Sequence, residues 1–185
     1  QRITVDDSWK FRKGEGGIIA ADVNDDGKRD FVITKVGHVA AYDNSGKNIW
    51  IKQIDIQVST NSENNGLPGW LGAGVQASDV DADLRTEVLF LTKKNTLHII
   101  DGATGATEKV ILLKHPEGTK RWEHLVITNF RGKGDRDLLL QTTNADGYRM
   151  GRYLAAYAIE DLMGKENFEP LWARDDFIPC AHNGA

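Results

Sequence analysis

The sequence has only one cysteine, Cys180, among its 185 residues, so no disulfide bond can form within the chain. It has no apolar run approaching the roughly 18 residues that a membrane-spanning helix needs. It also lacks a surplus of positive charge, since 23 Lys and Arg residues stand against 27 Asp and Glu residues, for a net charge of -4. These absences exclude a chain that crosses a membrane as a helix and argue against binding of nucleic acid through bulk charge.

What the sequence does contain is an internal repeat. Each copy is an apolar run, a polar loop of nine residues and a second apolar run. The loops begin 57 residues apart (Asp22 to Asp79) and 50 residues apart (Asp79 to Asn129), close to the period of propeller blades. The three copies are GGIIAADVNDDGKRDFVIT from Gly16, GVQASDVDADLRTEVLFLT from Gly74 and HLVITNFRGKGDRDLLLQT from His124.

Each repeat predicts four short strands rich in β-branched and aromatic residues, which is the pattern of a β-propeller blade. A single helical turn is predicted, over residues 158–166, where the other units have a hairpin. The fold class is therefore all-β, a single partial propeller over residues 1–185 whose remaining blades belong to a longer chain or, alternatively, to a separate chain. The predicted units are 16–56, 72–114 and 123–174, with 180–185 starting a further blade, and the strands of the first unit are 18–21, 31–34, 39–42 and 49–53.

The first nine-residue loop has the spacing of a cation site, because alternate oxygen donors surround a glycine that permits a tight reversal. An EF-hand does not fit, since its twelfth position would be Ile33, inside a predicted strand. The alternative is a solvated acidic turn. The predicted ligands are Asp22, Asn24, Asp26, the carbonyl of Lys28, and Asp30.

The other two loops depart from this pattern. In the second, Leu84 replaces the glycine at position six, where a left-handed backbone costs about 1 to 2 kcal/mol, so its occupancy stays open. In the third, Arg131 and Lys133 stand at positions three and five, and either could hold the loop without metal by pairing with Asp137. The predicted ligands of the second loop are Asp79, Asp81, Asp83, the carbonyl of Arg85, and Glu87.

These loops resemble the FG-GAP or VCBS repeats of calcium-stabilised β-propellers, and the resemblance covers nearly the whole chain. It implies structural Ca²⁺ and an exported protein, whether secreted, periplasmic or on the cell surface, because sites with dissociation constants of about 0.1 to 1 mM fill only where calcium is abundant. Similar repeats occur in adhesion heads, in bacterial surface proteins and in propeller-type polysaccharide lyases of the rhamnogalacturonan or rhamnose-glucuronate kind. The fold alone does not decide among these.

The rim opposite the acidic loops is predicted to carry the chemistry. Its loops are rich in cations and aromatic residues, which favours an acidic polysaccharide containing uronate as ligand, with no nucleic acid and no membrane span. Eliminative cleavage would use His124, Tyr148 or His182 as base or acid, with Arg149, Arg152 and Asn183 opposing the carboxylate. A non-catalytic carbohydrate-binding or adhesion module is the alternative, as is a purely structural scaffold. Trp70 and Trp122 would stack on sugar or pack between blades, while Trp9, Trp50 and Trp172 are predicted in the core or between blades.

Overall fold

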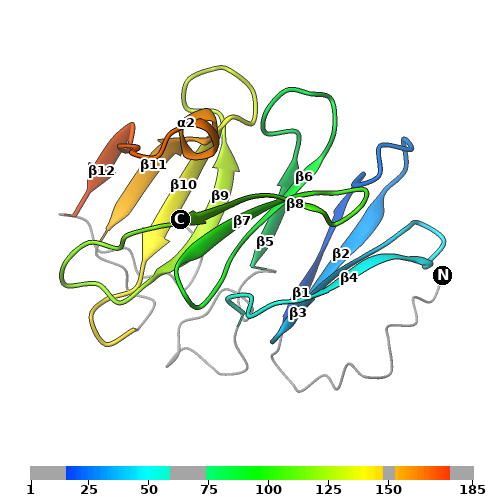
Figure 1. Ribbon diagram of the computed structural model, residues 1–185, viewed down its shortest axis with the longest axis horizontal. Helices are drawn as coiled ribbons and strands as arrows, with labels where there is room; N and C mark the ends of the chain where they lie inside the picture. The colour runs from blue at the N-terminus through cyan, green and yellow to red at the C-terminus, as the bar shows by residue number, and fades with distance from the viewer. Residues whose placement is uncertain (1–15, 59–73, 148–152, 176–185) are drawn as a thin grey trace.

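The computed structural model describes residues 16–58, 74–147 and 153–175 (Figure 1). Within these residues the regular structure is nearly all β, with three four-stranded antiparallel sheets and one short helix. In each sheet the strands lie side by side in the order of the chain. The predicted all-β class with propeller blades is thus confirmed, and no helix of the described part is long and apolar enough to cross a membrane.

The strand bounds follow the repeats. The predicted helical turn is present as α2 (Ile159–Gly164), between the last two strands of the third sheet. The predicted start of a further blade, 180–185, lies outside the described residues. The first sheet contains β1 (Gly17–Ala21), β2 (Asp30–Lys35), β3 (His38–Tyr42) and β4 (Asn48–Gln53). The second contains β5 (Val75–Ser78), β6 (Glu87–Leu91), β7 (Thr96–Asp101) and β8 (Thr107–Leu112). The third contains β9 (Trp122–Thr128), β10 (Asp137–Thr142), β11 (Leu154–Ala158) and β12 (Trp172–Arg174).

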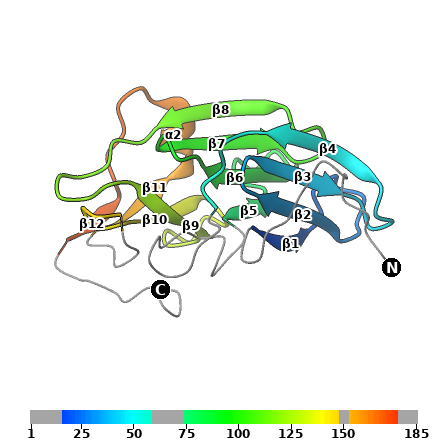
Figure 2. The same cartoon turned by 90° about the horizontal axis from the view of Figure 1, so that it is seen from below.

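The three sheets pack face to face around a common edge. Among the first strands of the three sheets, β5 contacts both β1 and β9. These three strands lie on one side in Figure 2, while β4 and β8 lie on the other. Strand β6 is buried along its whole length because a sheet covers each of its faces. Its alternate residues Val88 and Phe90 join the core shared with the first sheet, and Leu89 and Leu91 join the core shared with the third.

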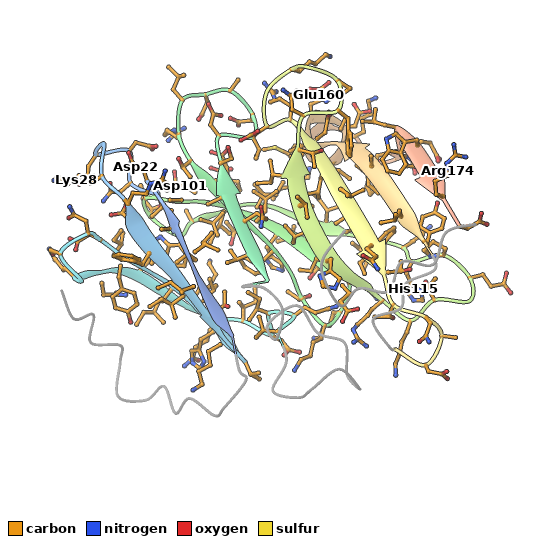
Figure 3. All side chains as sticks on the ribbon, turned by 180° about the vertical axis from the view of Figure 1, so that it is seen from behind. Asp22, Lys28, Asp101, His115, Glu160 and Arg174 are labelled. Atoms are coloured by element: carbon orange, nitrogen blue, oxygen red, sulfur yellow. The ribbon has the colours of Figure 1, made fainter. Side chains whose placement is uncertain are left out.

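The nine-residue loops share one rim with the connections between third and fourth strands, as predicted. The backbone N–H of Asn44, in the β3–β4 hairpin, donates to Asp30 Oδ1 at 3.1 Å. The guanidinium of Arg85 lies 3.8 Å from Asp101 in the β7–β8 hairpin. Figure 3 shows Asp22, Lys28, Asp101 and Glu160 toward this rim and His115 toward the opposite one. We call the two ends the loop rim and the opposite rim.

The tryptophans test the predicted packing. Trp50 and Trp122 are buried between sheets, which confirms the packing interpretation of both and leaves no open face of Trp122 for a sugar. Trp172 is 37% exposed within the described part of the chain, so it is not a core residue there, and its packing against a further blade stays a prediction. Its ring meets Phe130 edge-on instead, with ring centroids 5.4 Å apart. Trp9 and Trp70 lie outside the described residues.

Candidate metal centre and the opposite rim

The three nine-residue loops have the same backbone shape. In each, the side chain at position one accepts a hydrogen bond from the backbone N–H at position six. Positions four and six both have positive φ, which glycine adopts without strain and Leu84 adopts at a cost of about 1 to 2 kcal/mol. The closing bonds run from Gly27 to Asp22 (2.8 Å), from Leu84 to Asp79 (3.1 Å) and from Gly134 to Asn129 (3.0 Å). The φ values at position six are 81° at Gly27, 71° at Leu84 and 84° at Gly134.

The carboxylate at position nine is the buried end of each loop. Asp30, Glu87 and Asp137 are 0%, 1% and 0% exposed. Each accepts one backbone N–H from the start of its own loop. A buried carboxylate is costly unless it is hydrogen-bonded or paired, so a positive partner beside the acid would stabilise each loop. The donor is the backbone N–H of Val23 for Asp30 (3.2 Å), of Val80 for Glu87 (2.8 Å) and of Arg131 for Asp137 (2.8 Å).

The second loop gathers carboxylates at one point. One oxygen each of Asp79, Asp81 and Glu87 lie within 4.8 Å of one another, the one such group of three in the described ranges. Burial raises the pKa of Glu87 to about 7, and the negative charge of Asp81 adds to the shift. A divalent cation would offset this repulsion, and Ca²⁺ prefers six to eight oxygen ligands. The carboxylate of Asp83, also a predicted ligand, instead accepts two hydrogen bonds from the Arg85 guanidinium, at 2.8 and 3.0 Å.

The first loop has the predicted donors in a looser arrangement. Asp22 and Asn24 each accept a hydrogen bond from the backbone N–H of Asp26 at 3.0 Å, so their side chains converge over that N–H. The second oxygen of Asp26 lies 3.5 Å from the exposed ammonium group of Lys28. Burial raises the pKa of Asp30. The donor types of both loops fit a hard cation, and the second loop offers the tighter group of carboxylates.

The third loop contains its own cation. The Arg131 guanidinium donates to Asp137 at 2.5 Å and to Glu160 at 2.8 Å, and it donates to the carbonyl of Arg136 at 3.1 Å. The predicted pairing of Arg131 with Asp137 is therefore confirmed, whereas Lys133 lies 3.8 Å from Glu160. The hydrogen bond from Arg131 lowers the pKa of Glu160, which comes from α2. A side chain thus occupies the place where the other two loops would need an ion.

Of the predicted catalytic residues, only His124 lies in the described part of the chain. It sits inside β9, paired with Gln141 of β10, and is partly buried. Tyr148, Arg149, Arg152, His182 and Asn183 lie outside the described residues, so their proximity to His124 stays a prediction. Trp122, beside His124 on the strand, donates from Nε1 to the carbonyl of Lys114 at 3.2 Å.

The charge of the opposite rim is more balanced than the sequence indicates. Arg121 is one of the cations in the opposite-rim loops that the sequence analysis describes. It lies 3.6 Å from the buried carboxylate of Glu123 and donates to the carbonyl of Gly147 at 3.1 Å. Burial lowers the pKa of Arg121. Part of the positive charge of the opposite-rim loops is therefore paired inside the protein and does not face a ligand.

A cavity of about 460 Å³ lies between the second and third sheets and reaches His115. Its walls include the aromatic residues Trp122, Tyr153, Tyr157 and Phe168. Sequence reasoning missed this cavity, because the segment after α2 brings acidic residues to it from a different unit. The charged residues of its lining are Lys114, Glu166 and Glu169, so the described cavity does not favour an anion.

Comparisons with known proteins support the fold. No family model matches the chain, and no curated protein matches it. The rhamnogalacturonan lyase of Bacillus licheniformis aligns with a TM-score of 0.53 and 14% identity, over 91% of this chain and 35% of that one. The exotype rhamnogalacturonan lyase YesX aligns with a TM-score of 0.51 and 14% identity, over 86% of this chain and 32% of that one.

A protein of different activity aligns equally well. The dihydro-heme d1 dehydrogenase NirN gives a TM-score of 0.52 at 16% identity, over 88% of this chain and 28% of that one. Likenesses at such identities show the fold alone. The chain spans between 28% and 35% of the length of these three structures. Its three four-stranded sheets and its loops define a β-propeller-like fold.

Proposed function

We propose that the chain is part of an exported, calcium-stabilised β-propeller that acts on acidic polysaccharide by β-elimination. The observation that carries the calcium part is the group of Asp79, Asp81 and Glu87, whose oxygens lie within 4.8 Å of one another. The alignments with two rhamnogalacturonan lyases support the lyase part at the level of fold. Uronate-containing chains are the proposed substrate.

Calcium has a structural role in this proposal. Asp79, Asp81 and Glu87 would hold one ion, joined by the carbonyl of Arg85, and the predicted donors of the first loop would hold another. A bound cation would neutralise the buried carboxylates that close the loops and so hold the ends of β1 with β2 and of β5 with β6. Millimolar calcium outside the cell is the condition under which weak sites of this kind fill.

The proposed reaction needs three groups on the opposite rim. A base removes the proton on the carbon next to the uronate carboxylate, the C–O bond to the leaving sugar breaks as a C=C bond forms, and an acid protonates the leaving oxygen. His124, Tyr148 and His182 are the proposed base and acid. Arg149, Arg152 and Asn183 are proposed to stabilise the charge that develops on the carboxylate.

A non-catalytic carbohydrate-binding or adhesion module is the second candidate. Two observations favour it: His124 is partly buried within a strand, and the described cavity near His115 is lined by two glutamates and one lysine. Such a protein would bind a glycan without shortening it.

One assay separates the two candidates. Purified protein is incubated with a panel of uronate polymers at millimolar Ca²⁺, and ultraviolet absorbance of the unsaturated product is followed beside binding to a glycan array. The lyase proposal expects new absorbance that is weakened by substituting at least one of His124, Tyr148 and His182. Binding on the array without absorbance from any polymer would support the module instead.

A further inference from the structure

Two adjoining cavities lie between the second and third sheets. The larger is the cavity of about 460 Å³ that reaches His115. A second cavity, of about 350 Å³, shares Pro116 and Tyr153 with it. Both volumes fall within the range of roughly 300 to 1,000 Å³ that is typical of small-molecule sites. We call the two together the Tyr157 cavity. Their lining comes from residues 112–119, Trp122, Tyr153, Tyr157, residues 166–170 and Asp175.

Acidic side chains outnumber basic ones around the Tyr157 cavity. Its lining has four carboxylates and one lysine. None of the four carboxylates takes part in an ion pair within the ranges that the structure describes. A cavity lined in this way attracts a positively charged ligand. The acids are Glu117, Glu166, Glu169 and Asp175, and the lysine is Lys114.

The spacing of these acids indicates an organic cation and not a metal ion. In the described ranges, the one group of three acids or histidines close enough to share a metal ion is that of Asp79, Asp81 and Glu87 in the second loop. The acids of the Tyr157 cavity are therefore too far apart to surround a bare ion. An extended ligand with an ammonium group can place its charge beside one or two of them.

Tyr157 adds a hydrogen-bond donor that the protein itself does not use. Tyr157 is 8% exposed and lines the larger cavity, and its hydroxyl has no hydrogen-bond partner among the described residues. Burial raises the pKa of Tyr157 to about 12, so the hydroxyl keeps its proton and can donate it. A buried hydroxyl is costly without a partner, and an oxygen atom of a ligand would supply one.

The aromatic walls of the cavity hold one another in place. The buried ring of Trp122 meets the rings of Tyr153 and Tyr157 edge-on, with centroids 5.8 and 6.3 Å apart. Tyr157 in turn meets Phe168 edge-on at 5.9 Å. Tyr153 and Phe168 are half-buried and both line the larger cavity. The rings are therefore positioned before a ligand binds, which lowers the cost of binding.

The acidic segment is also fixed, at both of its ends. The backbone N–H of Lys165 donates to the carbonyl of Asp161 at 3.0 Å, and the N–H of Leu171 donates to the carbonyl of Ala156 at 2.7 Å. The first bond closes the end of α2, and the second attaches the chain to β11. Residues 166–170 thus lie between two anchored points, which places their carboxylates beside the aromatic walls.

We propose that the Tyr157 cavity binds an amino sugar. The ammonium group lies beside the exposed carboxylates of Glu166 and Glu169, a sugar oxygen accepts from the Tyr157 hydroxyl, and the rings of Tyr153 and Phe168 contact the apolar face of the sugar. This ligand is opposite in charge to the uronate polymer proposed above. The site uses none of the residues proposed for elimination and none of the loop ligands, so either proposal can fail without the other.

The test compares two sugars that differ in charge. Isothermal titration calorimetry of the full chain near pH 6 measures the dissociation constants of the disaccharide of glucosamine and of its N-acetylated form, which has no ammonium group. Millimolar Ca²⁺ is present, so that the acidic loops do not take up the amine. The N-acetylated sugar is expected to bind at least about tenfold more weakly, because it forms no ion pair with the two glutamates.

Two conservative variants assign the binding to the cavity. Tyr157→Phe should weaken binding of the amino sugar about fivefold, as loss of one hydrogen bond would. It should leave the melting temperature unchanged, because the hydroxyl has no partner in the described part of the protein. Glu169→Gln should weaken binding about threefold. The matched control is Asp146→Asn, which removes an exposed acid outside the lining and should change nothing.

Each outcome decides the proposal. Tighter binding of the amino sugar, weakened by both cavity variants and not by the control, supports it. No binding, or equal affinity for the two sugars, overturns it. If the linear diamine putrescine binds as tightly as the amino sugar and Tyr157→Phe weakens neither, the acids attract any amine and the proposal is wrong. Equal weakening by Glu169→Gln and Asp146→Asn would attribute the binding to overall charge and would also contradict it.

Discussion

The second and third loops share one backbone shape but balance their buried acid in opposite ways. At the second loop, Glu87 lies beside two aspartates, and its pKa is raised to about 7. At the third, Asp137 lies against the guanidinium of Arg131. The comparison teaches that the loop keeps its shape whether position three is Arg131, which supplies a counter-charge to the buried acid, or Asp81, which adds to the negative charge beside it. At the second loop we propose that a cation supplies the counter-charge.

Removing the internal cation should have the largest effect. Arg131→Met leaves Asp137 buried without its ion pair and is expected to lower the free energy of unfolding by about 3 kcal/mol. Urea unfolding measures this. Lys133→Met is the matched control and should change the free energy by less than about 0.5 kcal/mol, since its side chain is exposed. Equal losses from both variants would contradict the role of Arg131.

Converting the third loop to the pattern of the second should create a calcium response. With Arg131→Asp and Lys133→Asp together, the loop offers oxygens at positions one, three, five and nine. The double variant is expected to be unstable in chelator. When the calcium concentration is one hundred times the dissociation constant of the new site, its free energy of unfolding should rise by about 2.7 kcal/mol more than that of the natural sequence does. Calorimetric melting with and without Ca²⁺ measures the gain. An unchanged response would mean that loop shape and donors do not suffice.

Substitution of the leucine at position six should have a smaller effect, and it tests whether the left-handed backbone shared by the three loops is strained at Leu84. Leu84 has a φ of 71° and an 86% exposed side chain, so little packing is lost by removing it. Leu84→Gly should raise the free energy of unfolding by about 1 kcal/mol by relieving the left-handed strain. The reciprocal Gly27→Leu should lower it by a similar amount. Destabilisation by Leu84→Gly would show that the side chain contributes a contact.

The ion pair of the third loop predicts that the free energy of unfolding depends modestly on pH. The pKa of Glu160 is lowered in the folded protein by its hydrogen bond from Arg131, so the pair stabilises the fold above the ordinary value of 4.5. That contribution is lost as the pH falls through the lowered pKa, because the unfolded chain takes up the proton first. Glu160→Gln should therefore differ from the natural sequence at pH 6 and converge with it near pH 2. Urea unfolding across this range, with Glu166→Gln as control, measures the difference.

Local patterns predicted much of the fold. The four strands of the first sheet and the helical turn at α2 follow from runs of apolar residues and their spacing. The pairing of Arg131 with Asp137 was also predictable, since both lie in one nine-residue loop. Contacts between units were harder, because a sequence pattern does not show which sheet covers which. The exposure of Trp172 and the acidic lining beside His115 both depend on such packing.

The choice between the first and second loops as the better metal site shows the same limit of prediction from sequence. The glycine at position six favoured the first loop from sequence, but the second gathers three carboxylates in spite of Leu84. The two loops differ at positions three and nine. Position three is Asn24 in the first loop and Asp81 in the second, and the longer side chain of Glu87 is part of the group, whereas Asp30 accepts from the N–H groups of Val23 and Asn44. The direction in which each side chain points is a tertiary feature that the spacing of residues does not contain.

The most direct test of the account is the melting temperature in 2 to 5 mM Ca²⁺ compared with that in chelator. These calcium concentrations lie above the dissociation constants of about 0.1 to 1 mM expected for such loops. The account predicts a clear rise with calcium. Asp81→Ala should remove the share of the rise due to the second loop and Asp26→Ala that of the first, while Asp146→Asn on the opposite rim leaves it intact. Identical melting temperatures in calcium and chelator would contradict a cation at either loop.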